Sequence, residues 1–164
     1  MKISEVVKQP SSNLSQDTVN TRLETYNIDD FEKTNFQING FDLYKKDNEK
    51  FVVFDNNKAI SYLITYQYKN NMLEVKIAGV DKKYKRKGLM YSLYKLLVTD
   101  LNYILISDST WTKGAEMLWK KLINDFSLKV QVFDKSTNEN FDIKKRLPPN
   151  FFKNVHMRLM LSKG

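Results

Sequence analysis

The sequence contains no cysteine, so a disulfide framework, a thiolate zinc site and a cysteine nucleophile are all excluded. Its one histidine, His156, lies among apolar residues without a second candidate ligand, so we expect a packed or edge residue and no metal site. No run is long and apolar enough to cross a bilayer, and residues 1–8 lack the apolar centre of a secretory signal. We therefore expect a cytoplasmic protein without a membrane partner.

What the sequence has in excess is positive charge, with a formal net charge of +8. Such a charge attracts polyanions. Much of it is concentrated in Lys82–Lys87 and Lys144–Arg146. Because codon bias alone can produce a chain rich in Lys, Asn, Ile and Tyr, we do not take the charge as evidence of nucleic-acid binding. With 164 residues and no internal repeat or linker, the chain is expected to form a single domain over 1–164.

The amino-terminal part of the chain carries helix signals. Val19, Leu23 and Tyr26 recur at helical spacing, behind polar residues that can cap a helix. The elements expected here are a short strand at 3–7, a polar loop at 9–16, a helix capped by Ser15 or Asp17, and a short second helix from Asp29 or Asp30 that carries Phe31.

Four extended runs follow, at residues 41–45, 51–54, 59–68 and 72–80. Turns rich in Asn and Asp separate them, as in tight hairpins, so we predict an antiparallel meander. In the third run, alternate apolar and aromatic residues are predicted to share one face of the sheet. They are Ile60, Tyr62, Ile64, Tyr66 and Tyr68. Such a row packs across strands, and an aromatic face can also stack nucleic-acid bases.

Residues 80–90 connect the last of these runs to a helix-like run, and they place basic side chains beside Gly88. The first N–H groups of a helix have no acceptor within the helix, and the helix dipole favours an anion there. Glycine lets a ligand approach the backbone, while lysine and arginine attract it. The pattern is typical of a seat for a phosphate or pyrophosphate. A solvated run of charges and a contact to a nucleic-acid phosphate remain alternatives.

The rest of the chain predicts two helices and three strands. Residues 88–99 are apolar around most of a helix, and 103–106 indicate an interior strand parallel to the run before the basic turn. A polar turn at 107–112 leads into the second helix. The remaining expected elements are a strand at 128–133, a long irregular segment at 134–154 and a final strand at 155–161.

Residues 80–90 resemble motif A of the GNAT superfamily of N-acetyltransferases, in which a strand runs into Arg/Gln-x-x-Gly-x-Gly/Ala. Val80 and Tyr84 are in register, Lys85 stands at the Arg/Gln position and Gly88 matches the first glycine. In that family the loop binds the pyrophosphate of acetyl-coenzyme A. Met90 replaces the final Gly/Ala, where a side chain could crowd the pyrophosphate.

The helix after the polar turn resembles motif B of the same superfamily, Asn-x-x-Ala-x-x-Leu-Tyr followed by Phe. These positions are occupied by Thr112, Ala115, Leu118, Trp119 and Phe126. The last four of these residues, together with Leu122, also form the apolar row of the helix. Trp119 replaces a tyrosine that commonly reprotonates the coenzyme A thiolate. An indole N–H cannot do this near neutral pH.

The resemblance implies a GNAT-like α/β fold, with a mixed, mostly antiparallel, twisted sheet of about six to eight strands flanked by about four helices. Residues 1–40 would supply the amino-terminal strand and helices, 59–133 the core with the coenzyme-binding motifs, and 134–154 a long loop before the last strand. The implied activity is acetyl-coenzyme A-dependent transfer of an acetyl group to a primary amine by direct attack, without a metal.

The resemblance also assigns roles to residues. Backbone groups of Ala78 and Val80 would hold the pantetheine arm. Glu74 is one candidate for the base that deprotonates the amine, and Asp108, where the central strands separate, is another; an exposed strand carboxylate and a helix cap are the simpler roles for these two residues. The other coenzyme contacts that it implies are Lys85, Arg86, Lys87, Gly88, Leu89, Met90 and Thr112.

Two other functions remain open. The substitutions at Met90 and Trp119 would suit a GNAT-fold protein that binds its ligand but does not turn it over. The basic turn and the tyrosine face would suit a nucleic-acid-binding module, which we do not favour. The acceptor, a small molecule or a protein that bears an amine, is not identified by the sequence.

Overall fold

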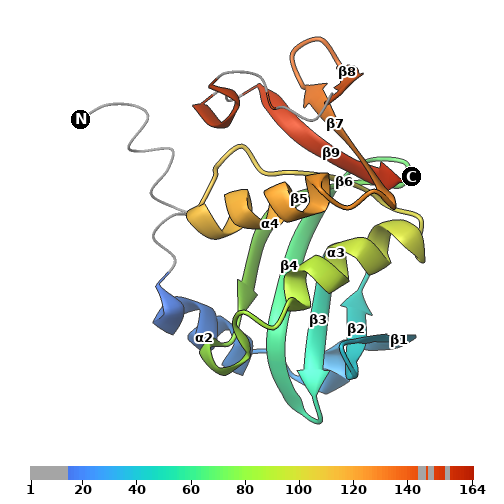
Figure 1. Ribbon diagram of the computed structural model, residues 1–164. Coiled ribbons are helices and arrows are strands. Elements are labelled where there is room, and N and C mark those ends of the chain that lie inside the picture. Colours follow the sequence, from blue (N-terminus) through green and yellow to red (C-terminus); the bar gives the residue numbers. More distant parts are fainter. Residues whose placement is uncertain (1–14, 144–146, 148–149, 154–155) are drawn as a thin grey trace.

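The computed structural model describes residues 15–143, 147, 150–153 and 156–164, which form one nine-stranded sheet in the order β1-β2-β3-β4-β5-β6-β9-β7-β8 (Figure 1). The strands are β1 (Glu32–Ile38), β2 (Phe41–Lys46), β3 (Lys50–Asp55), β4 (Lys58–Lys69), β5 (Met72–Val80), β6 (Ile104–Ile106), β7 (Leu128–Asp134), β8 (Glu139–Asp142) and β9 (Met157–Lys163). The helices are α2 (Gln16–Glu24), α3 (Leu89–Thr99) and α4 (Lys113–Ile123), with 3-10 turns η1 (Ile28–Asp30), η2 (Lys82–Tyr84) and η3 (Phe151–Lys153). The mixed α/β class is confirmed.

Helix α2 begins where the sequence predicts. The Ser15 hydroxyl is its cap and accepts a hydrogen bond from the N–H of Thr18 at 3.1 Å. The strand expected at 3–7 and the basic cluster Lys144–Arg146 lie outside the described residues.

The antiparallel meander is confirmed and comprises β1 to β5. Its turns place Asn39, Asp47, Asn56 and Asn70 at φ values of 52°, 52°, 53° and 49°. Asn and Asp tolerate this left-handed backbone, which tight hairpins require. The turn residues therefore let each strand fold back directly on the one before it.

The prediction of a second helix from Asp29 or Asp30 is wrong, because η1 is a single turn and the chain continues as β1. In β1, Thr34, Phe36 and Ile38 are partly or fully buried, while the residues between them are exposed. A period of two residues belongs to a strand and not to a helix.

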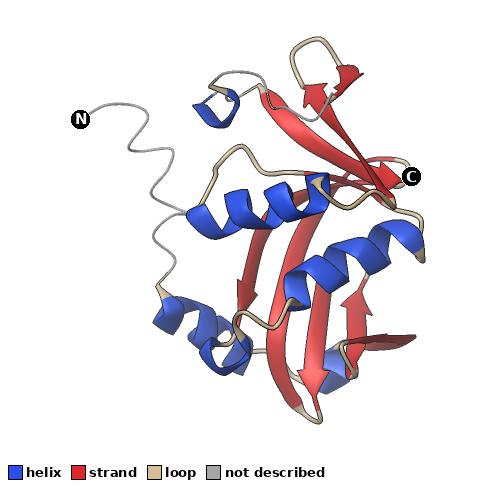
Figure 2. Ribbon diagram, in the orientation of Figure 1, coloured by secondary structure: helices blue, strands red, loops and turns tan. Residues whose placement is uncertain are grey.

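Helices α3 and α4 pack on one face of the sheet and α2 packs on the other (Figure 2). Val53 of β3 belongs to the same buried cluster as Leu93 of α3, whereas its neighbour Val52 belongs to a cluster with Leu23 of α2. Successive strand residues point to opposite faces, so the two clusters are separate cores on the two sides. The larger core lies beneath α3 and α4.

The predicted row of residues on β4 is broken at its start. A register shift between β3 and β4 leaves Ile60 as the extra residue of a bulge, and its side chain joins the core beneath α3. Tyr62 is fully buried in the α2 cluster, Tyr66 is 53% exposed, and the ring of Tyr68 contacts Phe133 at 5.9 Å between centroids. The tyrosines therefore do not form a continuous exposed platform.

The segment 134–154, predicted to be irregular, contains β8 and η3. Strand β8 pairs with β7 as a hairpin. The final strand β9 lies between β6 and β7, so the last strand in the chain occupies an interior place in the sheet.

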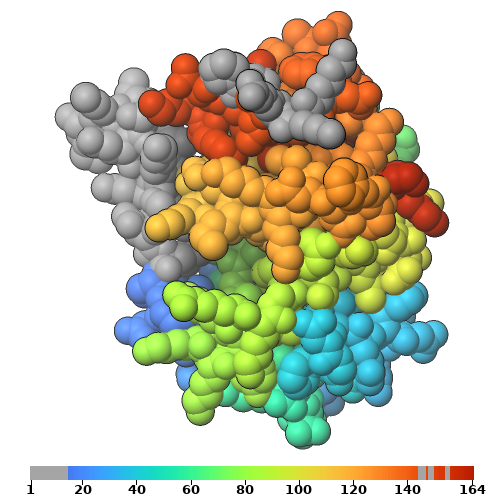
Figure 3. Space-filling view, in the orientation of Figure 1, coloured from blue at the N-terminus to red at the C-terminus, as the bar shows by residue number. Residues whose placement is uncertain are grey.

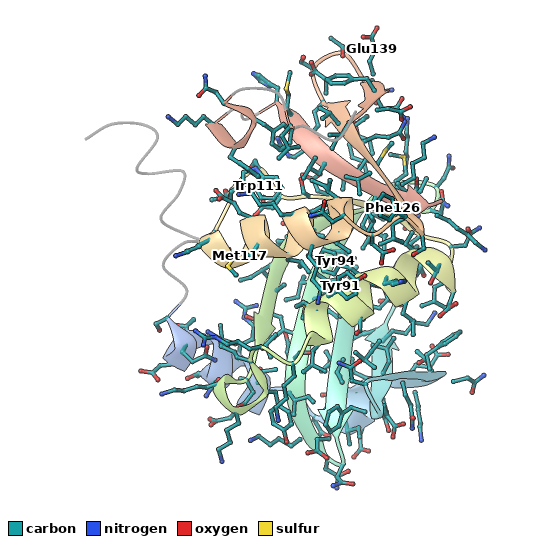
Figure 4. The ribbon with its side chains drawn as sticks, in the orientation of Figure 1. Tyr91, Tyr94, Trp111, Met117, Phe126 and Glu139 are labelled. Carbon is teal, nitrogen blue, oxygen red and sulfur yellow. The ribbon has the colours of Figure 1, made fainter. Side chains whose placement is uncertain are left out.

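The sequence predicted Phe126 on the apolar face of α4, and this prediction is wrong. The helix ends at Ile123, and Phe126 is 95% exposed in the turn that follows (Figure 4). The carboxylate of Asp125 accepts a hydrogen bond from the N–H of Ser127 at 2.9 Å, which fixes this turn. The helical spacing therefore stops before it reaches Phe126.

Candidate functional site

Strands β5 and β6 run parallel and pair only at their amino-terminal ends. Residues 72–74 of β5 are opposite residues 104–106 of β6. Beyond this pairing, Val75–Val80 has no strand partner on that side within the described residues. The two strands therefore separate toward their carboxyl ends, and α3 and α4 begin in the loops that follow those ends (Figure 1).

Backbone groups at the end of β5 face the opening. The N–H of Asp81 donates to the carbonyl of Ile60 at 2.8 Å, so Asp81 is directed at β4. Alternate residues of an antiparallel ladder direct their backbone groups to opposite sides, which places those of Val80 and Ala78 on the free edge. The carbonyl of Val80 already accepts a hydrogen bond from the side-chain amide of Gln16 at 2.9 Å, and this contact fastens α2 to that edge.

The basic turn is held in place by buried and aromatic side chains. The carboxylate of Asp81 is buried, accepts the N–H of Lys83 at 2.8 Å and pairs with Lys58 at 3.4 Å. The hydroxyl of Tyr84 donates to Asp55 at 2.6 Å, and this hydrogen bond is the main cause of the raised pKa of Tyr84. The turn therefore has a fixed backbone although its basic side chains are exposed.

Gly88 is the N-cap residue of helix α3 and has a φ of +73°, and no side chain caps the first turn of the helix. A Cβ built on Gly88 would meet no atom within 4 Å, so the space over this backbone is open. The side chains of Lys85, Arg86 and Lys87 are exposed around it, and none forms an ion pair within the part of the chain that the structure describes. In Figure 3 this yellow-green segment stands out beside α2, in blue. An uncapped helix start with exposed cations is suited to bind an anion.

The next two residues of the predicted phosphate loop point inward. Leu89 is buried in the main core, and Met90 is partly buried and packs against the same core. The thioether that replaces the expected Gly/Ala therefore need not occupy the space over the first-turn N–H groups.

The candidate contact from the second helix has a structural role. The hydroxyl of Thr112 caps α4 and accepts the N–H of Ala115 at 3.0 Å. Helices α3 and α4 thus start differently, because the first turn of α4 has a side-chain cap and that of α3 has none.

Glu74 lies in the paired part of β5, on the face opposite α3, because its neighbours Leu73 and Val75 point into the core beneath α3. Its two carboxylate oxygens accept hydrogen bonds from Nζ of Lys135 at 3.2 and 3.1 Å. Nε of Arg158 lies 4.0 Å from Glu74 Oε1. The charge of Glu74 is therefore compensated by two cations.

Asp108 follows β6 at the point where the strands separate. The pairing with β9 continues through Ser107, whose N–H donates to the carbonyl of Leu159 and whose hydroxyl accepts the Leu159 N–H, both at 2.8 Å. One residue further in this register, Asp108 comes opposite Arg158. Burial raises the pKa of the Asp108 carboxyl, while backbone hydrogen bonds and the charge of Arg158 oppose that rise.

Arg158 brings the two candidate bases together. It is 7% exposed on β9, and burial lowers its pKa while the charges of Glu74 and Asp108 raise it. Sequence reasoning missed this residue. The available signal was a basic residue within the otherwise apolar run 157–161, where a charge is buried only if it is paired.

No profile of a protein family and no curated protein matches the sequence. Among solved structures, the ribosomal-protein-S18-alanine N-acetyltransferase from Escherichia coli is 18% identical over 70% of this chain and 67% of that chain, with a TM-score of 0.40. Diaminobutyrate acetyltransferase from Paenibacillus lautus, in complex with L-2,4-diaminobutyric acid and coenzyme A, is 8% identical over 71% of this chain and 70% of that chain, with a TM-score of 0.42. A chain from Bacteroides thetaiotaomicron assigned to the GNAT family of acetyltransferases is 10% identical over 93% of this chain and 83% of that chain, with a TM-score of 0.42.

The strand order and the divergence of the one parallel pair agree with the architecture that motifs A and B imply. The fold is mixed α/β. Its described residues form nine strands where about six to eight were expected, because β1 and β8 were not predicted from the sequence.

Trp119 is a packing residue in the described fold. It is 2% exposed, and its ring lies 5.9 Å from that of Tyr94 and 6.3 Å from that of Trp111. Tyr94, on the side of α3 that faces α4, is also buried (Figure 4). Burial and then the charge of Asp108 raise the pKa of the Tyr94 hydroxyl, so a neutral phenol lies near Asp108. Sequence reasoning treated Tyr94 as part of an apolar stripe.

The described ranges contain no group of three or more His, Cys, Asp and Glu side chains that could hold a metal ion. Within them, no helix combines the length and the apolar character needed to cross a membrane. His156 is exposed just before β9, and its carbonyl accepts the N–H of Lys135 at 2.9 Å.

Proposed function

We propose that this protein is an acetyl-coenzyme A-dependent N-acetyltransferase that acetylates a primary amine. The observation that carries the proposal is the parallel pair β5–β6, which opens beside an uncapped helix start flanked by exposed cations. Such an opening can take an acyl arm between the strands while the helix start takes the diphosphate that anchors it. Both parts are needed for a thioester carrier of this shape.

In this proposal the diphosphate contacts the backbone of residues 85–90, and the acyl arm runs along the free edge at Ala78 and Val80. The N–H of Val80 is a suitable donor to the thioester carbonyl, where negative charge develops during attack. Because Gln16 occupies the carbonyl of Val80, a ligand that needs this acceptor displaces the Gln16 amide. Thr112 supports the first turn of α4 and is a less direct coenzyme contact.

The reaction is an acyl transfer by direct attack. The neutral amine attacks the thioester carbon, the C–N bond forms, and the C–S bond breaks with its electron pair leaving on sulfur. A carboxylate takes the proton that the nitrogen loses, and the thiolate takes a proton from solvent, so the products are an amide and coenzyme A. Glu74 and Asp108 are the carboxylates near the separating strands, and both face Arg158.

Two measurements test the proposal in sequence. Calorimetry with acetyl-coenzyme A is expected to show a single site. A thiol-release assay over a panel of small amines and amine-bearing proteins is then expected to show turnover with at least one acceptor. Absence of binding would remove the proposal.

One observation favours a second candidate, a GNAT-fold protein that binds the coenzyme without turning it over. Trp119 fills a buried packing position where the family commonly has its proton donor. Tight binding together with no thiol release over the whole panel would select this candidate.

Binding of nucleic acid at the basic turn is the remaining possibility. It has less support than the sequence suggested, because Tyr62 is buried and Tyr68 packs on Phe133, so the stacking face is interrupted. Nucleic-acid affinity that falls steeply with salt and persists with coenzyme A present would favour it.

A further inference from the structure

The two candidate bases are held differently although they share one cation. Both carboxylate oxygens of Glu74 accept hydrogen bonds from Nζ of Lys135, and Oε1 of Glu74 lies 4.0 Å from Nε of Arg158. If Glu74 accepted a proton, two buried or half-buried cations would lose their counter-charge. Its position in the paired part of β5 also sets it back from the opening. These contacts fit a fixed counter-ion better than a proton acceptor.

Asp108, unlike Glu74, lies at the opening between the strands. It lies beyond the last paired residue of β6, on the side where the strands open. The groups that face it are Arg158 from β9, Tyr94 from α3, and the N–H groups of Ser109 and Thr110 in its own loop. Among these, Arg158 is the group that carries a positive charge. The half-buried Asp108 carboxylate is therefore stabilised by the N–H groups of Ser109 and Thr110 and by the Ser109 hydroxyl, together with the charge of Arg158 from the neighbouring strand.

We infer that Arg158 is a positioning residue, which holds Asp108 ionised at the opening as the proton acceptor and shares Glu74 with Lys135 as a fixed counter-ion. This inference rests on the proposed transferase function for the part that concerns the proton. In the reaction, Asp108 takes one proton from the attacking nitrogen. Arg158 touches neither the amine nor the thioester.

The experiment measures the ionisation of Asp108 directly. The carboxyl carbons of the unliganded protein are titrated by NMR in the wild type, Arg158→Met, Arg158→Lys and Lys129→Met. Lys129 is exposed on β7, so its substitution removes one positive charge away from the opening. The same proteins give pH profiles of thiol release with the best acceptor of the panel.

Arg158→Met is expected to raise the pKa of Asp108, because it removes a positive charge that lowers this pKa. The acidic limb of the kcat/KM profile is expected to move upward with it. Arg158→Lys keeps the charge and is expected to restore most of both values. Lys129→Met is expected to leave both unchanged.

An unchanged Asp108 pKa in Arg158→Met overturns the inference, as does a loss of activity in Arg158→Lys as large as in Arg158→Met. If Arg158→Met does not fold, the kcat values of Asp108→Asn and Glu74→Gln test which carboxylate accepts the proton. The first is expected to lower kcat by about a hundredfold or more with coenzyme binding intact, and the second by less than about tenfold; the reverse order overturns the inference. If the wild type does not bind coenzyme A, the transferase proposal fails, while the titration still tests the coupling of Arg158 to Asp108.

Discussion

Gly88 and Gly40 both have a positive φ, but they lie at different places in the fold. Their φ values are +73° and +87°, and a Cβ at either position would meet no atom within 4 Å. Only Gly88 stands at the start of a helix, beside exposed cations. Substitutions at the two glycines can therefore distinguish the effect of backbone strain from the effect of filling the space in which a ligand would lie.

Gly88→Val is expected to weaken acetyl-coenzyme A binding by at least about thirtyfold, because the added side chain keeps the diphosphate from the first-turn N–H groups. This equals about 2 kcal/mol, the size of one or two hydrogen bonds to a charged group. Calorimetry measures the affinity, and far-UV circular dichroism is expected to stay unchanged.

Gly40→Val is the control for strain, since it adds a side chain at a positive φ without adding one at the helix start. Gly40 follows Asn39, whose side-chain amide donates to the carbonyl of Lys87 at 3.0 Å, so the variant also tests whether disturbing that contact affects binding. Its affinity is expected to stay within about threefold of the wild type, well below the effect of one lost hydrogen bond to a charged group. Equal losses in the two variants would assign the effect to strain and remove Gly88 from the site.

Which site residues the sequence could predict depends on how local their signals are. Gly88 was found because a glycine and neighbouring cations at a helix start form a pattern within a few residues. The ion pair of Glu74 could not be predicted from the sequence, because its partner Lys135 is 61 residues away. Arg158 and Tyr94 were missed for the same reason, since only tertiary contacts place them beside Asp108.

At the scale of elements, Asp125 joins α3 to the turn after α4. Its carboxylate accepts hydrogen bonds from Lys95 Nζ at 2.9 Å and from the hydroxyls of Tyr91 and Ser127. These bonds, that from Ser127 first, hold the pKa of the Asp125 carboxyl far below its ordinary value. Helix α3, whose first turn forms the proposed diphosphate seat, is thus fastened near its middle to the helix beside it.

Asp125→Asn is expected to lower the free energy of unfolding by about 2 kcal/mol at neutral pH, because charge-assisted hydrogen bonds are lost. A folded-state pKa below the unfolded value stabilises the protein above the unfolded pKa of about 3.9, and this contribution is lost as the pH falls further. Urea denaturation at several pH values is therefore expected to show the difference between wild type and variant shrinking below about pH 4.

The control for this measurement is Asp100→Asn. Asp100 is exposed at the end of α3, and its side chain has no hydrogen bond or ion pair among those found in the described residues. Its effect is expected to stay within about 0.5 kcal/mol. A difference for Asp125→Asn that does not change with pH would mean that packing, and not the ionised carboxylate, stabilises the contact.

The elements that the sequence predicted well are those with a buried period or a turn signal. The hairpins of the meander follow from Asn and Asp at positive φ, and α3 and α4 from their apolar residues. Strand β8 could not be predicted because all of its residues are exposed, so it has no apolar alternation. The bulge at Ile60 was equally invisible, since it arises from the pairing of β4 with β3.

At the scale of the molecule, the site depends on strand order. Strand β9 is the last in the chain, yet it lies beside β6 in the sheet. That placement brings Arg158 opposite Asp108, although 50 positions separate them in the sequence (158 − 108). The divergence of β5 from β6 is likewise a property of the assembled sheet. The sequence motifs indicated where β5 and β6 should separate. The order of the strands in the sheet then places Arg158 beside that opening.

The net charge of +8 gives a test of the proposed ligand at long range. Raising the ionic strength from about 0.01 M to about 1 M shortens the Debye length from about 30 Å to about 3 Å, which screens the basic turn from an approaching polyanion. If the phosphates of the ligand bind at that turn, the association rate of acetyl-coenzyme A is expected to fall at least about tenfold over this range. Stopped-flow fluorescence of the tryptophans measures the rate.

Acetyl-pantetheine makes the comparison specific, because it has the same thioester and arm but no phosphate. Its association rate is expected to change little with salt, since an uncharged ligand gains nothing from the field of the cations. Salt-independent binding of both ligands would move the diphosphate away from residues 85–90. An equal salt dependence for both would instead mean that salt acts on the protein, for example on the contact between Lys58 and Asp81 that holds the turn.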